Sequence, residues 1–101
     1  MLKEVNREEL QSALGKGVQL VVFFAEWCGP CKMYKQSLEA LSEAQGIDIL
    51  RVNIDKERDL SIEHRVSSIP LTEIYVDGEM VETVSGYLPF EQIQAVVLKH
   101  F

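Results

Sequence analysis

The chain has two cysteines, Cys28 and Cys31, separated by two residues. Two thiols at this spacing can exchange with a disulfide when one thiolate is stabilised and exposed and the second thiol can reach it afterwards. An apolar strand pattern gives way to a helical one at this point, which places Cys28 at a helix N-terminus. Because unpaired backbone N–H groups and the helix dipole favour a thiolate there, we expect Cys28 to attack and the less exposed Cys31 to resolve.

Two other uses of a cysteine pair are a zinc site and a structural disulfide. Zinc would need two more ligands, but the separation of the two histidines, His64 and His100, matches no zinc-finger spacing. We expect both histidines to be solvated helix residues. The N-terminal segment has no basic stretch followed by an apolar run, so we expect a cytoplasmic protein, in which structural disulfides are rare. A redox dithiol without a metal is therefore favoured.

The elements that must position this dithiol follow from the apolar pattern. In the first half of the chain we predict a short strand over 2–5, a helix that starts at the capping box Asn6–Glu9 and stops before Gly15, a buried strand over 18–25 and a helix from Pro30 to Gly46. A strand over 47–54, a short helix or loop over 55–65, and a hairpin of 71–76 and 80–84 around Asp77–Gly78 follow. A last helix begins at Pro89 and turns Ile93, Val96, Val97 and Phe101 inward. This order indicates an α/β fold, a mixed sheet with helices on both faces.

Length and charge limit the range of functions. The 101 residues suffice for one domain, residues 1–101, and 47% of them are apolar, which is ample for its core. A net charge of −6 disfavours nucleic acids and anionic membranes as partners. We expect a monomer.

The motif Trp27-Cys28-Gly29-Pro30-Cys31-Lys32 resembles the active site of the thioredoxin family. Three more segments resemble family elements in the right order, namely Val52-Asn53-Ile54-Asp55 (an inner strand), Ser68-Ile69-Pro70 (a cis-proline loop), and Asp77-Gly78-Glu79 with Gly86 (the hairpin and the glycine after it). The resemblance spans nearly the whole chain and implies the thioredoxin fold. Gly29-Pro30 is typical of thioredoxins, which reduce disulfides, rather than of glutaredoxins or the oxidising disulfide isomerases.

The resemblance also implies roles for individual residues. Cys28 would be the nucleophile and Cys31 the resolving thiol. A shallow docking groove would be formed by an edge of Trp27, Gly29 and Pro30, an opposite wall of Ile69 and Pro70, and an end closed by Ser85, Gly86 and Tyr87. The bond before Pro70 would be cis, and the backbone of Ile69 would pair with an extended substrate segment. The chain would hold no cofactor, because thioredoxin reductase, an NADPH-dependent flavoenzyme, would supply its electrons.

One departure from the family concerns the proton of Cys31. Val22 stands where thioredoxins usually have a buried aspartate that accepts this proton. In the family a basic residue accompanies that acid, and this chain also has a basic residue there, Arg51. A buried Arg51 would need a counter-ion. Glu73 is a candidate acid that could approach Arg51 and complete a proton relay. Alternatively, the alternation of Leu71, Glu73 and Tyr75 marks a partly solvated face of the predicted strand.

The sequence therefore predicts a thiol–disulfide oxidoreductase that reduces protein disulfides. Two alternatives stay open. The chain could be a reductant dedicated to one client, which the missing acid at position 22 favours, or a binding module in which the dithiol is incidental.

Overall fold

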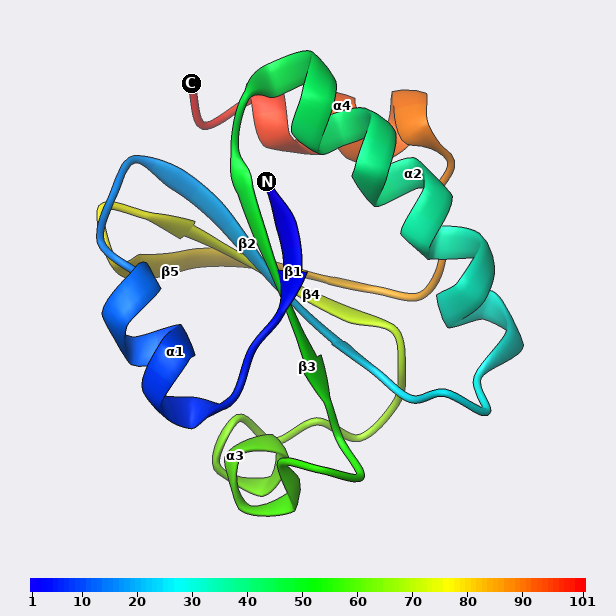
Figure 1. Ribbon diagram of the computed structural model, residues 1–101. Helices are drawn as coiled ribbons and strands as arrows, with labels where there is room; N and C mark the ends of the chain where they lie inside the picture. Colours follow the sequence, from blue (N-terminus) through cyan, green and yellow to red (C-terminus); the bar gives the residue numbers. More distant parts are fainter.

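A computed structural model describes all 101 residues, which form one five-stranded sheet flanked by four helices (Figure 1). The strands are β1 (Leu2–Glu4), β2 (Val18–Phe24), β3 (Asp48–Asn53), β4 (Leu71–Val76) and β5 (Glu79–Ser85). The helices are α1 (Arg7–Ala13), α2 (Gly29–Gln45), α3 (Arg58–Glu63) and α4 (Phe90–Leu98). The sheet order is β1-β3-β2-β4-β5, with β1, β3 and β2 parallel and with β4 antiparallel to both β2 and β5.

Local sequence signals account for the ends of several elements, as predicted. Asn6 and Glu9 form the expected capping box, in which each side chain accepts a hydrogen bond from the other residue's backbone N–H. Gly46 ends α2 in the left-handed region, with φ +64°. Asp77 and Gly78 both have positive φ, as a tight hairpin turn between β4 and β5 requires. The predicted mixed sheet is confirmed.

The sheet separates two apolar clusters. One lies under α2 and α4 and includes Leu20, Val22, Tyr34, Leu38, Leu41, Ile74, Ile93 and Val97. The other lies under α1 and α3 and includes Leu10, Val21, Phe23, Leu50, Val52, Leu60 and Tyr75. Alternate residues of the central strand β2 enter the two clusters, so every residue from Gln19 to Phe24 is buried.

One predicted core residue is wrong. Ile93 and Val97 are buried on α4 and Val96 is half-buried, but Phe101 is 63% exposed. The cause is that α4 ends at Leu98, so the last residues no longer follow the helical repeat.

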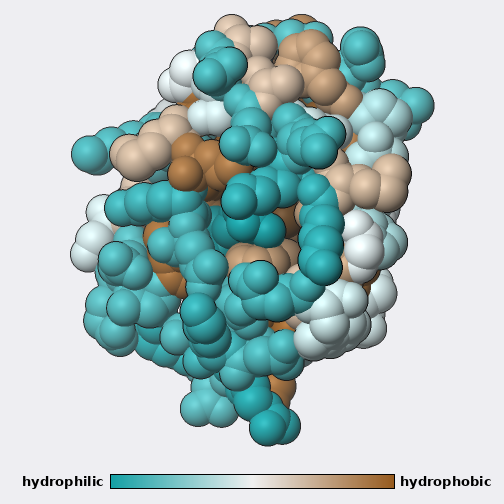
Figure 2. Space-filling view, turned by 45° about the vertical axis from the view of Figure 1, so that its right-hand side comes forward, coloured by the Kyte–Doolittle hydropathy of each residue, from teal (hydrophilic) through white to brown (hydrophobic).

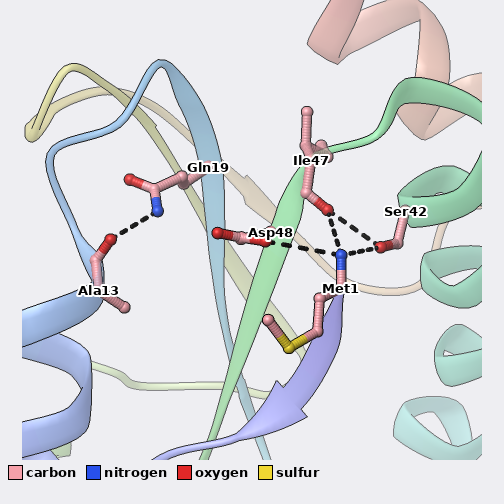
Figure 3. A network of polar contacts seen from close by, with 6 residues as sticks. All are labelled: Met1, Ala13, Gln19, Ser42, Ile47 and Asp48. Atoms are coloured by element: carbon pink, nitrogen blue, oxygen red, sulfur yellow. Dashed lines mark hydrogen bonds and ion pairs between the residues drawn. The ribbon is translucent and has the colours of Figure 1, made fainter.

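Polar contacts join the outer strand to the elements beside it. The amino group of Met1 donates to Ser42 Oγ at 2.7 Å and to the carbonyl of Ile47 at 2.9 Å, and it lies 3.6 Å from Asp48 (Figure 3). These contacts tie β1 to the connection between α2 and β3. No helix has both the length and the apolar character needed to span a bilayer. The face seen in Figure 2 is mostly hydrophilic, with its apolar residues in separate small patches.

Candidate active site

Both cysteines lie at the start of α2, where β2 ends and the chain turns into the helix. Cys28 is the N-cap, and the N–H of Cys31 donates to its Sγ at 3.2 Å. The two sulfur atoms are joined in a disulfide, and the two Cα atoms are 5.2 Å apart. We expected an exposed Cys28, but in this oxidised form Cys28 and Cys31 are only 5% and 3% exposed. The reason is that the disulfide packs against Phe24 and Ala25, with Ile54 and Ile69 alongside.

Trp27 projects from the surface beside the dithiol. Its side chain is 68% exposed, and its indole N–H donates to Asp55 Oδ2 at 2.8 Å. Asp55 lies just after β3, so this bond joins the segment before α2 to the neighbouring β3–α3 connection. Gly29 and Pro30 are also exposed. The three residues predicted to form one edge of the groove are therefore open to a partner.

Residues from the far part of the chain also reach the cysteines. Ile69 packs against the cluster that contains both of them, and the bond between Ile69 and Pro70 is cis, as the resemblance implied. The N–H of Gly86 donates to the carbonyl of Pro70 at 2.8 Å, and Ser85 pairs with Leu71 across the β4–β5 hairpin. Tyr87 is exposed at its edge and contacts the ring of Tyr34 from α2, with ring centroids 6.2 Å apart.

A polar cavity of about 240 Å³ lies behind Cys31. It is lined by Glu4, Phe24, Ala25, Glu26, Cys31, Lys32, Lys35 and Arg51. The guanidinium carbon of Arg51 lies 3.7 Å from the centroid of the Phe24 ring, and burial lowers the pKa of Arg51 although Glu4, Glu26 and Glu39 oppose that shift. The largest cavity, about 440 Å³, lies between β1 and α1 and contains neither cysteine.

The predicted approach of Glu73 to Arg51 is wrong. Arg51 pairs in register with Val22 on the face under α2, whereas Glu73 pairs with Val21 and points to the face under α1 and α3. Arg51 has no acidic partner within 4 Å and stacks on Phe24 instead. A solvated Glu73 is wrong as well, because the residue is only 3% exposed.

The carboxylate of Glu73 is held by two side chains that the sequence did not connect with it. His64 Nδ1 lies 2.9 and 3.0 Å from its two oxygens, and Tyr75 Oη donates to Oε1 at 2.9 Å. The expectation that His64 is solvated is therefore wrong. His100 is likewise half-buried, with its Nε2 2.9 Å from Glu82. The sequence contained one signal for the first pair. Glu73 is an acid in a predicted strand of a sheet that helices were expected to cover on both faces, so it needed a buried partner.

A second buried polar contact joins the cysteine helix to β4. Tyr34 lies one turn after Cys31, and its hydroxyl is 2.7 Å from Thr72 Oγ1. Burial raises the pKa of Tyr34 to about 12, and the hydrogen bond to Thr72 opposes that shift. Thr72 comes two residues after Pro70, so this bond fixes the spacing between α2 and the strand that follows the cis-proline loop.

Comparison with known proteins gives one consistent result. The profile of the family described as Thioredoxin matches residues 1–99. Among curated relatives, the thioredoxin of Listeria monocytogenes is 35% identical over 102 residues, covering 99% of both chains, and that of Bacillus subtilis is 37% identical over 95 residues, covering 92% of this chain and 91% of the relative.

Solved structures agree with this result. A mutant thioredoxin from Halobacterium salinarum superposes with a TM-score of 0.92 at 27% identity, covering 98% of this chain and 89% of its own. The chloroplastic thioredoxin z superposes with a TM-score of 0.89 at 28% identity, covering 97% and 92% of the two chains.

Proposed function

We propose that Cys28 is the nucleophile and Cys31 the resolving thiol of this chain, which belongs to the thioredoxin family and is a protein-disulfide oxidoreductase. The observation that carries this assignment is the position of Cys28 at the N-cap of α2, where the helix dipole and the N–H of Cys31, which donates to Cys28 Sγ, stabilise a thiolate. Cys31 lies inside the first turn and has no such position.

The reaction follows from these two roles. The Cys28 thiolate attacks one sulfur of a partner disulfide, so that a Cys28–partner bond forms and the partner's second sulfur leaves as a thiolate. The Cys31 thiolate then attacks the Cys28 sulfur, which forms the intramolecular disulfide and releases the other partner thiolate. Two electrons pass to the partner. The disulfide in this structure corresponds to the oxidised end of that cycle.

The docking groove is proposed from the residues that surround the disulfide. Trp27, Gly29 and Pro30 offer exposed surface on one side, and Ile69 packs on the other. Ile69 belongs to no strand and its N–H makes no backbone hydrogen bond, so it can pair with an extended substrate segment by strand addition. In this proposal Pro70 completes that wall, and Ser85, Gly86 and Tyr87 close the end of the groove.

We propose that the polar cavity behind Cys31 replaces the usual buried acid. With Val22 apolar and Glu73 on the other face of the sheet, the polar groups that share a cavity with Cys31 include Glu26, Lys35 and Arg51. A positive charge near a thiol favours its thiolate, so Arg51 assists the loss of the Cys31 proton to water in this cavity.

The partners in this proposal are protein disulfides as substrates and a thioredoxin reductase as electron donor, with the chain acting as a cytoplasmic monomer in cellular redox homeostasis. The bacterial relatives named thioredoxin support the first two of these roles. The acidic charge of −6 argues against nucleic acids and anionic membranes as partners.

Insulin reduction tests the function, and Cys31→Ser tests the two cysteine roles. Catalytic turnover with NADPH and a thioredoxin reductase is the expected result for the wild type. Turnover with dithiothreitol alone would indicate a reductant dedicated to one client, and no turnover from an intact Cys28–Cys31 pair would indicate a binding module. The Cys31→Ser variant should accumulate a mixed disulfide at Cys28, whereas Cys28→Ser should not accumulate one at Cys31. The reverse pattern would overturn the assignment.

A further inference from the structure

The segment that carries Ile69 is fixed mainly at its two ends. No backbone–backbone hydrogen bond involves Ser67, Ser68 or Ile69. On the N-terminal side, the N–H groups of His64, Arg65 and Val66 bond back to α3 at 3.0 Å each, and on the C-terminal side β4 begins at Leu71. The position of Ile69 against the disulfide therefore depends on how the end of α3 is held relative to the start of β4.

The Glu73–His64 pair makes that connection. His64 is the C-cap of α3 and Glu73 is the third residue of β4, so their contact closes a loop whose middle contains Ile69 and Pro70. Nδ1 of His64 lies within hydrogen-bond distance of both oxygens of the Glu73 carboxyl group, so a single nitrogen bridges the two oxygens. The Tyr75 hydroxyl donates to the same carboxylate, which leaves Glu73 little freedom to turn away.

Packing strengthens the connection on the β2 side. The His64 ring lies 5.2 Å from the ring of Phe23, between centroids, and Val66, Ile69 and Leu71 pack on the same apolar cluster. A buried polar pair of this kind adds little to the free energy of unfolding compared with apolar side chains of the same size, but it admits only one arrangement of its partners. It can therefore specify where the loop lies.

We propose that Glu73 and His64 are positioning residues for substrate docking: the buried pair between β4 and the end of α3 holds the backbone of Ile69 where an extended partner segment can pair with it. This inference rests on the proposed function, because it assumes that Ile69 forms a wall of the groove. Neither side chain contacts the cysteines, so the pair acts on docking and leaves the reactivity of Cys28 unchanged.

The chain contains a matched control. His100 and Glu82 form a second His–Glu pair, with Nε2 2.9 Å from Oε1, between the end of α4 and β5. The loop that this second pair closes contains Ser85, Gly86 and Tyr87, at the proposed end of the groove, but neither Ile69 nor Pro70. Comparing His64→Leu with His100→Leu therefore separates loss of any His–Glu pair from loss of the pair that encloses the Ile69 segment. His64→Asn keeps an N–H donor near the position of Nδ1 and serves as the conservative rescue.

The test combines kinetics with amide hydrogen exchange of the purified full-length protein. For His64→Leu we expect KM for insulin to rise about tenfold with kcat unchanged, because losing one or two backbone hydrogen bonds to a substrate has this size. The rate with a small aromatic disulfide, which cannot pair with Ile69, should stay unchanged. Amide exchange at Arg65 and Val66, whose N–H groups bond back to α3, should accelerate. His64→Asn should resemble the wild type in all three measurements, and His100→Leu should leave amide exchange at Arg65 and Val66 unchanged.

Each other outcome overturns one specific claim. If the wild type does not reduce insulin, the proposed function fails. If the wild type reduces insulin but His64→Leu keeps its KM, or changes KM without faster exchange at Arg65 and Val66, the positioning role is wrong. A fall in kcat with both substrates, in proportion to the fraction of unfolded protein, would show that His64 serves only the stability of the fold. Glu73→Leu combined with His64→Leu removes both polar members of the pair together, so it should stay folded and still show the raised KM.

Discussion

Replacing Tyr34 with phenylalanine tests how the cysteine helix is fixed to β4. The Tyr34 hydroxyl and Thr72 Oγ1 are 2.7 Å apart, and both residues are fully buried. Tyr34→Phe removes one partner and leaves the Thr72 hydroxyl buried without its bond, which costs about 1–3 kcal/mol of unfolding free energy. Replacing both partners, as in Tyr34→Phe with Thr72→Val, should recover most of this loss, because no polar atom is then left unpaired.

The loss should depend on pH in a defined direction. Burial raises the pKa of Tyr34 from 10.0 to about 12 in the folded protein, so the folded state favours the neutral hydroxyl. The stability that Tyr34 contributes is therefore fully present below the unfolded pKa of 10.0 and is lost as the pH rises through about 12. At about pH 11 the Tyr34 hydroxyl is mostly ionised in the unfolded state and mostly neutral in the folded state. This difference lowers the unfolding free energy of the wild type by about 1.4 kcal/mol relative to neutral pH. Phenylalanine cannot ionise, so the advantage of the wild type over Tyr34→Phe should shrink by this amount.

Urea unfolding of the oxidised proteins near neutral pH and at about pH 11 measures this difference. Burial raises the pKa of Tyr75 too, but Tyr75 is present in both proteins and cancels from the comparison. Tyr87→Phe is the control for losing a tyrosine hydroxyl at an exposed position, because Tyr87 is 37% exposed, and it should cost less unfolding free energy than Tyr34→Phe. An equal difference between wild type and Tyr34→Phe at both pH values would refute the argument that burial keeps Tyr34 protonated.

Two further changes test local features of the fold. Gly46→Ala should lower the unfolding free energy in urea by about 1 kcal/mol. Gly46 ends α2 at φ +64°, and the space around it is open, so backbone strain is the only cost of the added methyl group. Gly46→Asn should cost less, because asparagine tolerates this backbone conformation better, and equal costs for the two variants would contradict this reason. Asp55→Ala should weaken the near-ultraviolet circular dichroism of Trp27, the only tryptophan, because the indole loses its bond to Asp55; an unchanged spectrum would mean that this bond does not orient the ring.

Elements with a strong local signal could be predicted from the sequence. The capping box at Asn6, the glycine after α2 and the Asp77–Gly78 turn depend on residues close together in the chain, so their types and spacing suffice. The position of Cys28 at a helix N-terminus followed from the same kind of pattern. Phe101 shows the limit of this reasoning, because a periodic pattern does not reveal where the last helix ends.

The environment of Glu73 could not be predicted from local pattern, because it depends on which strands are neighbours and in which register. Alternation along β4 suggested a solvated face, but β4 lies inside a sheet with helices on both sides, where neither face is open to water. The predicted layers and the predicted exposure of Glu73 were therefore inconsistent. The identity of its partner, nine residues earlier at His64, required the path of the loop between α3 and β4.

The sheet also decides which charged residues can take part in the chemistry of Cys31. Val22 lies beside Arg51 on β3 and beside Thr72 on β4, so an acid at position 22 would lie on the same face as Arg51 and the cavity behind Cys31. Glu73 lies on the opposite face, and no rotation of its side chain brings it through the sheet. In the proton route proposed above, the half-buried Arg51 in the wall of this cavity favours the Cys31 thiolate by electrostatic attraction, and the proton leaves to water.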